Sequence, residues 1–308
     1  MCSYPTARAR LACALGPLAL WLALPAAARA CSMCRCSDPV FSALGQGLYT
    51  QYGFRLALDW SRLDQSQGEG PDFEAQVRNT VTATLAVGWK ERLTFVAQVP
   101  YTFNHLTTAD GVETADGLAD PAFYLYARLW SSDFGPGLGR RAWISAVFAI
   151  KTPWGQNDAT ENGERLDEHV QPGTGATNLS GGLSTLYLLD ASSSLYASAA
   201  YTGTGRNSFG YKYGDNVQAN LVYERKFTDW LNGVLELNFL DAKEDQIDAT
   251  GITDPNTGGK TLYLTPRIGV SLGRGLVVRA GVQIPVWKDL NGIQDVKPAY
   301  SAGLTFLF

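Results

Sequence analysis

Apolar and polar residues alternate with a period of two along most of this chain. From Phe73 to Trp89 the odd positions are mostly apolar, whereas the even positions carry charged residues, an amide and threonines. The alternation resumes from Leu93 to Phe103, directly after the short segment 90–92. A period of two gives a β-strand one apolar and one wet face, and two such strands joined by a tight turn pair antiparallel. The chain is therefore predicted to be all-β.

Further alternating segments raise the expected number of strands to about twelve. The connections between them alternate between short turns and long segments rich in Gly, Asp, Asn and Thr. This pattern is typical of a membrane-spanning barrel, whose strands return through short turns on one side and long loops on the other. The additional strands are expected to begin near Leu48, Ala122, Trp143, Leu179, Leu195, Asn216, Leu231, Leu262, Leu276 and Ala299.

Alternation alone does not separate a membrane barrel from a soluble antiparallel sandwich. Aromatic residues near strand ends, where a barrel meets the membrane interface, favour the barrel. The chain also ends on an alternating strand, and its Phe306 and Phe308 resemble the signal by which the outer-membrane assembly machinery recognises its clients. We therefore predict a transmembrane antiparallel up-and-down β-barrel over residues 48–308, in outer-membrane lipid, with short periplasmic turns and longer extracellular loops. The interfacial aromatics are Trp60, Trp89, Tyr101, Phe103, Trp143, Trp230, Trp287 and Phe308.

Residues 1–30 have the organisation of a secretory signal peptide. Two arginines precede an apolar run over 11–24, and the small residues Ala28 and Ala30 offer a cleavage site before Cys31. The alternative is a lipoprotein signal that acylates Cys31, which is disfavoured because Ala28 stands where such signals carry Leu. Export to the bacterial outer membrane is the expected outcome.

The charge of the exported chain excludes one class of partner. Cleavage before Cys31 removes three of the 25 basic residues and none of the 29 acidic ones, so the net charge falls from −4 to −7. Phosphate backbones need a basic surface, and we expect no nucleic-acid partner.

Three segments rich in Gly and Pro occur in a particular order. They are Gly117-Leu118-Ala119-Asp120-Pro121 ahead of Tyr126-Ala127-Arg128-Leu129, then Lys151-Thr152-Pro153-Trp154-Gly155, and then Gln171-Pro172-Gly173-Thr174-Gly175-Ala176-Thr177-Asn178-Leu179. They resemble the Gly-Leu-Gly-Asp turn, the Leu-Pro-Thr-Gly strand exit and the Pro-Gly-Thr-Gly re-entry of the outer-membrane barrel family named for the meta-pathway of phenol degradation. Ala119 and Trp154 depart from these motifs. The resemblance implies a barrel with a transport role and names no cargo.

All cysteines of the exported chain lie close together, at Cys31, Cys34 and Cys36. Three neighbouring thiols cannot all pair within one chain, so at least one stays free, bridges another molecule, binds a soft metal or carries a lipid. Thiolates select Cu(I), Zn(II) or iron–sulfur clusters, and the thioether of Met33 would suit copper. The alternatives for the periplasmic tail over 31–47 are therefore a structural disulfide or a metal or redox site that contacts a periplasmic partner. The apolar residues of this tail would also allow it to fold into the barrel as a plug.

The wet face of the strands would line the lumen of the barrel. It carries both signs of charge, which would form either a packed, salt-bridged filling or the lining of a narrow polar path. The charged members are Arg55, Asp59, Glu74, Arg78, Arg128, Lys151, Glu224, Glu236, Arg267 and Arg279, and the amides are Gln76, Gln98 and Gln283.

No pattern in the sequence indicates catalysis. His105 and His169 each fall in a predicted loop, and neither belongs to a Ser-His-Asp or His-rich metal pattern. Four carboxylates in one predicted loop lack the spacing of a calcium loop and favour a solvated acidic loop. These carboxylates are Asp110, Glu113, Asp116 and Asp120.

Two functions remain for a barrel that is not an enzyme. The first is a channel that admits small, hydrophobic or aromatic solutes by passive diffusion. The second is a scaffold whose Cys31, Cys34 and Cys36 carry a redox or soft-metal function while the barrel anchors it in the membrane.

Overall fold

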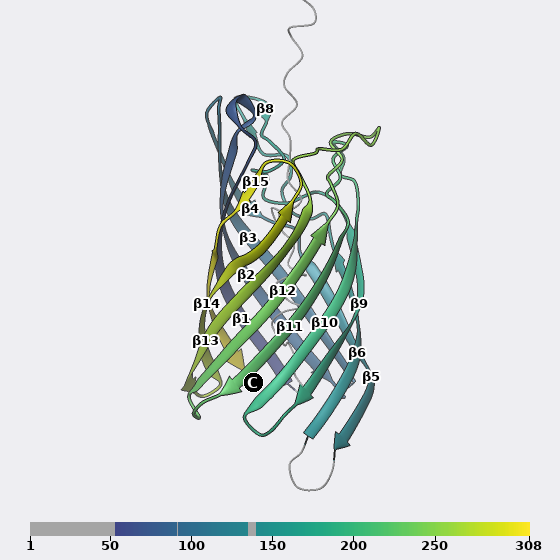
Figure 1. Ribbon diagram of the computed structural model, residues 1–308, viewed down its shortest axis with the longest axis vertical. Helices are drawn as coiled ribbons and strands as arrows, with labels where there is room; N and C mark the ends of the chain where they lie inside the picture. Colours follow the sequence, from purple (N-terminus) through teal and green to yellow (C-terminus); the bar gives the residue numbers. More distant parts are fainter. Residues whose placement is uncertain (1–52, 91, 135–139) are drawn as a thin grey trace, which may run out of the picture.

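One antiparallel sheet closes on itself to form a barrel (Figure 1). The computed structural model describes residues 53–90, 92–134 and 140–308. Strand β1 (Gly53–Gln67) pairs with β2 (Glu74–Trp89) on one side and with β16 (Ala299–Leu307) on the other, which closes the sheet. Around the wall follow β3 (Leu93–Thr108), β5 (Ala122–Phe134), β6 (Arg140–Lys151), β9 (Asn178–Leu188), β10 (Ser193–Thr204), β11 (Asn216–Lys226), β12 (Leu231–Ala242), β13 (Gly259–Gly273) and β14 (Leu276–Leu290).

Two positions in the wall are each shared by two segments. Strand β4 (Val112–Leu118) pairs with one part of β3, and β5 pairs with the other part. In the same way β15 (Gln294–Val296) and β16 both pair with β1. The 14 segments of the sheet therefore occupy twelve positions, and the prediction of an antiparallel barrel of about twelve strands is confirmed. The expected start at Leu48 lies outside the described residues.

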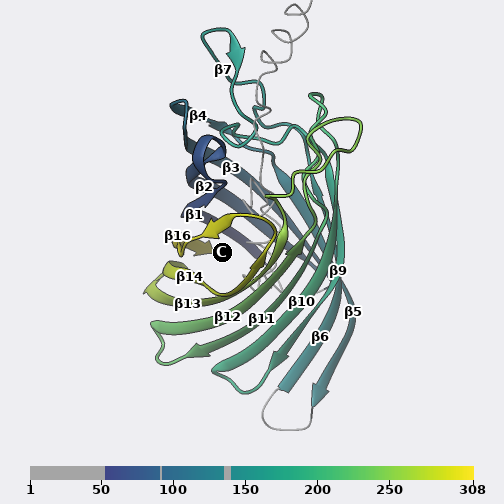
Figure 2. The ribbon, with the colours of Figure 1, turned by 45° about the horizontal axis from the view of Figure 1, so that its top comes forward.

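The two ends of the barrel differ in the length of their connections (Figures 1 and 2). At the short-turn end only a few residues join β2 to β3, β9 to β10, β11 to β12 and β13 to β14. The opposite, long-loop end carries the connections 152–177, 205–215, 243–258 and 291–298. Two small elements interrupt loops at this end, the hairpin of β7 (Thr160–Glu161) and β8 (Glu164–Arg165) and the 3-10 helix η2 (Gly70–Asp72). The described residues contain no helix with the length and apolar character needed to cross a membrane.

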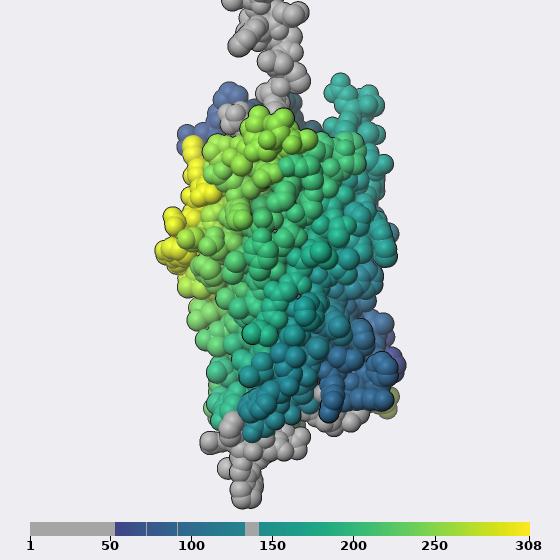
Figure 3. Space-filling model, turned by 90° about the vertical axis from the view of Figure 1, so that its right-hand side faces the viewer, coloured from purple at the N-terminus to yellow at the C-terminus, as the bar shows by residue number. Residues whose placement is uncertain are grey.

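The wall has an apolar outer face and a largely polar inner face. On β1 the outward side chains Phe54, Leu56 and Leu58 are 57%, 46% and 51% exposed, while the intervening Arg55 and Ala57 are buried. Figure 3 shows the strands as slanting bands of colour along one side of this outer wall. Inside, polar side chains bond to one another from strand to strand, as buried polar groups require. One such row joins Ser198, Asn220, Asn238 and Thr265 through bonds of 3.2, 2.8 and 2.8 Å.

The outer face generates a test of membrane insertion. Leu221 lies at the middle of β11 and is exposed on the outer face. Leu221→Arg places a charge against lipid and should lower the free energy of unfolding by up to about 2–4 kcal/mol. Unfolding in lipid vesicles as a function of urea concentration measures the loss. Leu221→Ala is the matched control and should cost less, so an equal loss in the two variants would contradict lipid contact at this position.

Candidate functional site

A loop from the long-loop end folds into the barrel and is buried there. We call residues 166–177, which join β8 to β9, the inner loop; residues 168–174 are buried without interruption. Its backbone carbonyls accept hydrogen bonds from side chains of the inner wall. Arg78 and Gln76 of β2 donate to the carbonyl of residue 169, the former at 3.0 Å, and Asn104 of β3 donates to those of residues 170 and 171 at 2.9 and 3.0 Å. The wall therefore supplies the partners that a buried loop backbone requires.

A buried ion pair anchors the other half of the inner loop. Lys151, at the end of β6, lies 2.8 Å from Asp120, and the two side chains are 1% and 0% exposed. Asp120 also accepts hydrogen bonds from the backbone N–H and hydroxyl of Thr174, at 2.8 and 2.6 Å, and from the N–H of Gly155 at 3.0 Å. Such a pair is tolerated in a low-dielectric interior only when the remaining hydrogen-bonding capacity is satisfied, as it is for this carboxylate.

Two glycines allow the loop to approach this ion pair. A Cβ added to Gly173 would lie 2.8 Å from the Cα of Gly155 and 2.9 Å from an Asp120 oxygen. A Cβ added to Gly155 would lie 2.6 Å from the carbonyl carbon of Ala119. Because these neighbours are backbone atoms or the anchored carboxylate, a side chain at either position would push the inner loop away from the wall.

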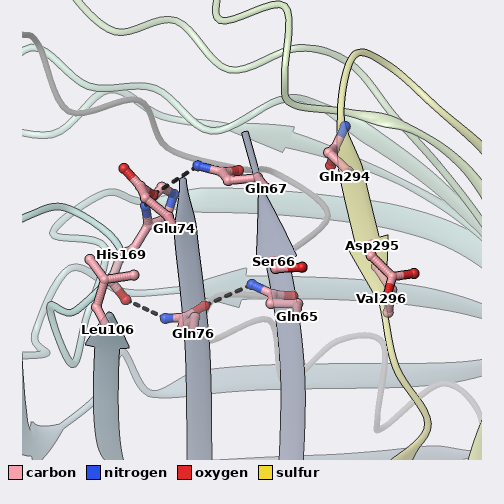
Figure 4. Close-up of a pocket in the computed structure, with 10 residues that line it drawn as sticks. All are labelled: Gln65, Ser66, Gln67, Glu74, Gln76, Leu106, His169, Gln294, Asp295 and Val296. Carbon is pink, nitrogen blue, oxygen red and sulfur yellow. Dashed lines mark hydrogen bonds and ion pairs between the residues drawn. The ribbon is translucent and has the colours of Figure 1, made fainter. Parts of the chain in front are cut away.

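His169, at the tip of the inner loop, contacts two carboxylates. Its Nδ1 lies 3.0 Å from Glu74 on β2 and 3.0 Å from Asp167. Burial lowers the pKa of His169, but the charge and hydrogen bonds of Asp167 and Glu74 outweigh this and raise the pKa well above its usual value. The imidazolium would therefore hold the loop tip against the wall. Figure 4 shows His169 and Glu74 beside a small space, about 20 Å³, bounded by Gln67 and β15.

Within the described ranges, Glu74, Asp167 and His169 form the group whose ligand atoms lie close enough together to hold a metal ion. One ligand atom from each of Glu74, Asp167 and His169 lies within 4.8 Å of the others. Both carboxylates face the same imidazole nitrogen, so a shared proton accounts for the arrangement. We therefore assign the group as an ion-paired cluster that holds the inner loop against the wall, and we call it the latch.

A cluster of buried tyrosines lies at the long-loop end. Tyr211 and Tyr213, from the connection between β10 and β11, pack with Tyr263 of β13 in one buried apolar cluster. Asn207 in the same connection donates to the Glu168 carboxylate at 2.6 Å and to a carbonyl of the inner loop at 3.1 Å. The two loops therefore bond to each other at this end of the barrel.

The short-turn half of the barrel contains a larger cavity of about 380 Å³. One side is charged, with Arg267 lying 3.3 Å from Glu236 and Arg279 lying 2.8 Å from Asp59. The other side is formed mainly by apolar or aromatic side chains of β9 to β12. These are Leu186, Leu188, Tyr196, Val222 and Val234. We call this space the lower cavity.

The structure distributes the residues expected to line the lumen over three places. Arg55, Glu224, Glu236, Arg267 and Arg279 border the lower cavity, and Asp59 is the partner of Arg279. Glu74, Arg78 and Lys151 hold the inner loop or the loop next to it. Arg128 lies over the ring of Trp143 at 5.3 Å.

The other expected sites are placed as follows. Phe306 and Phe308 are exposed, and the N–H of Phe308 donates to the carbonyl of Phe54 at 3.0 Å. Cys31, Cys34 and Cys36, together with the tail over 31–47, lie outside the described residues, and their metal or redox role stays a prediction.

Two expectations about loops are wrong. Asp120 is no solvated loop carboxylate, since it is buried against Lys151, and Glu113 and Asp116 belong to β4. His105 lies within β3 and not in a loop, whereas His169 lies in a loop as predicted, although that loop is buried inside the barrel. Sequence reasoning predicted a long loop in this region but not that it folds into the barrel. Its Gly and Pro residues indicate turns but do not say that the turn points inward.

The buried ion pair gives a prediction for stability. Lys151→Met leaves the Asp120 charge buried without its cation and should lower the free energy of unfolding by about 3–5 kcal/mol. Urea unfolding in vesicles measures this loss. Lys260→Met is the control, because Lys260 pairs with Asp241 at 3.9 Å with both side chains exposed, and its removal should have almost no effect. A small loss in Lys151→Met would show that the pair is not an anchor.

The latch at His169 gives a prediction for pH. A histidine whose folded pKa is raised contributes a stabilisation that is complete below its unfolded pKa of about 6.5 and is lost as the pH rises through the folded pKa. Cleavage of the inner loop by added protease, corrected for the pH dependence of the protease, should therefore increase toward alkaline pH. His169→Gln removes the titrating group and should abolish this step. A wild-type protein whose cleavage does not change with pH would contradict the latch.

Comparisons with known proteins agree with this architecture. The family described as "Putative MetA-pathway of phenol degradation" matches residues 61–289. An outer membrane channel from Pseudomonas putida F1 has a similar crystal structure, with a TM-score of 0.64, 11% identity and coverage of 86% of this chain and 98% of that chain. The translocator domain of the autotransporter NalP from Neisseria meningitidis has a TM-score of 0.52 at 12% identity, with coverage of 90% and 96%. No curated protein matches the sequence. The family match extends over most of the chain, which therefore belongs to this phenol-degradation barrel family.

Proposed function

We propose that this chain is an outer-membrane channel through which small, hydrophobic or aromatic solutes diffuse passively. The lower cavity is the observation that carries the proposal. Its volume of about 380 Å³ exceeds the roughly 150 Å³ that accommodates benzene in an engineered protein cavity, and one of its walls is apolar. The similar crystal structure from Pseudomonas putida F1 is that of an outer membrane channel, which supports the same role.

The inner loop would act as the extracellular gate of this channel. It closes the long-loop end through hydrogen bonds to β2 and β3 and through the ion pair at Asp120. A solute entering from outside would have to displace this loop before it reached the lower cavity. The short-turn end would then face the periplasm, in keeping with the general arrangement of bacterial barrels.

Delivery to the membrane would use the two ends of the chain. The signal peptide over 1–30 would direct export, and the assembly machinery would read the terminal strand. Phe308 is accessible for such reading, since it is 74% exposed. The alternative of a redox or metal scaffold depends on Cys31, Cys34 and Cys36, and no feature of the described residues supports it.

A substitution that fills the lower cavity tests the channel. Val222 points into the cavity from β11, whereas its neighbour Leu221 points outward. Val222→Trp should reduce uptake of a radiolabelled aromatic solute several-fold in porin-deficient Gram-negative cells that express the protein. Leu221→Trp adds the same bulk on the outer face and should leave uptake unchanged. Equal uptake by cells with wild-type protein, with Val222→Trp and with no barrel would overturn the channel.

A further inference from the structure

Arg55 differs from the other arginines of the lower cavity because it has no partner. It lies on β1, borders the cavity and is 9% exposed, and among the described residues it makes no hydrogen bond or ion pair. Its Nε is buried without a hydrogen-bond acceptor. A guanidinium cannot lose its proton at physiological pH, so a buried one requires an anion or several acceptors. The charges of Asp59 and Glu224 act on Arg55, yet neither carboxylate forms an ion pair with it among the described residues.

The nearby carboxylates are bound elsewhere. Asp59, two residues along the same face of β1, pairs with Arg279 at 2.8 Å. Glu236 lies 3.3 Å from Arg267. Glu224, the third carboxylate of this region, accepts a hydrogen bond from Asn232 at 2.8 Å. Asp59 and Glu236 are thus paired with other arginines, whereas Glu224 is bonded only to a neutral amide and acts on Arg55 without contacting it.

A second donor lies on the adjacent strand. Thr305 of β16 borders the same cavity and is 4% exposed, and its hydroxyl is buried without a hydrogen-bond partner in the described structure. Thr305 is paired in register with Ala57, two residues from Arg55 on β1. A guanidinium and a hydroxyl on neighbouring strands are suited to the two oxygens of one carboxylate.

The opposite side of the cavity requires a different kind of group. In the strand order of the wall, β10 lies half-way around the barrel from β1. The apolar residues of β9 to β12 therefore face Arg55 and Thr305 across the lumen, with Tyr196 of β10 among them. These side chains offer no charge to a ligand and would bury apolar surface. The lower cavity thus has one wall with three arginines and an opposite wall that is mainly apolar but also carries Glu224 and Glu236.

We propose that the lower cavity binds a small organic carboxylate with an apolar body of aromatic size. Arg55 and Thr305 bind the carboxylate, and the side chains of Leu186, Leu188 and Val222 contact the body. This inference rests on the proposed channel and names the class of solute that it favours. A neutral hydrocarbon would contact the apolar side but would offer the Arg55 guanidinium no hydrogen-bond acceptor. The site therefore discriminates between an aromatic acid and its uncharged analogue.

Equilibrium dialysis of the folded full-length exported chain in detergent tests the site, with protein-free micelles as the blank. The probes are radiolabelled benzoate, the uncharged benzamide, and acetate, which carries the charge without the apolar body. We expect benzoate to bind at least tenfold more tightly than either of the others, since a hydrogen-bonded charge inside a protein has an effect of this size. Arg55→Gln should remove the preference for benzoate over benzamide, and Thr305→Val should weaken benzoate binding a few-fold.

Matched variants separate loss of the site from loss of the fold. Arg62→Gln changes an arginine on the same strand whose side chain is 42% exposed and pairs with Asp64 at 3.2 Å, and it should bind benzoate as wild type does. Arg55→Lys keeps the charge and should retain part of the preference over benzamide, which a merely structural role of Arg55 would not predict.

Several outcomes would overturn the proposal. They are equal binding of benzoate and benzamide by the wild type, equal binding of acetate and benzoate, and an unchanged preference in Arg55→Gln. If one of these is found while Val222→Trp still reduces uptake of a neutral aromatic solute, the proposed anion site is rejected and the proposed channel is retained. If uptake is also unchanged in Val222→Trp, both the proposed site and the proposed channel are rejected.

Discussion

The structure depends on the pairing of β1 with β16. Because the first and last strands of the described wall bond to each other, the sheet closes on itself, which is the condition for a sheet to stand in lipid. Closure also determines the direction of every side chain in the wall, since alternate residues must then point either to lipid or to the lumen. The apolar outer face, the polar inner rows and the two ends with unequal connections all follow from this one condition.

The inward polar residues have different roles in the two halves of the barrel, which composition alone does not reveal. At the long-loop end the inward charges and amides bind a loop, and tyrosines form a buried cluster. Toward the short-turn end the inward polar groups line a cavity together with apolar side chains. Inward charged and amide residues therefore bind a loop in one half of the barrel and border a cavity in the other.

The sequence predicted the wall well because a period of two is a local signal. The strands expected near Asn216, Leu231 and Leu276 begin at those residues, and the total of twelve follows from counting them. The interior was harder to predict, since its partners are distant in sequence. Asp120 reads as one more acid of a loop until Lys151, 31 residues later, is seen beside it. His169 likewise meets Glu74 only because the chain between β6 and β9 turns inward, and no periodicity reports such a turn.

The inner loop is held by contacts that have to be released together. Its carbonyl bonds, the ion pair beneath Thr174 and the close glycine packing are all made by one short, continuous stretch of backbone. Lifting that stretch partway would break most of these contacts and restore none of them. If the inner loop gates the channel as proposed, its opening would be cooperative, and a current through single molecules would switch between discrete levels instead of varying smoothly.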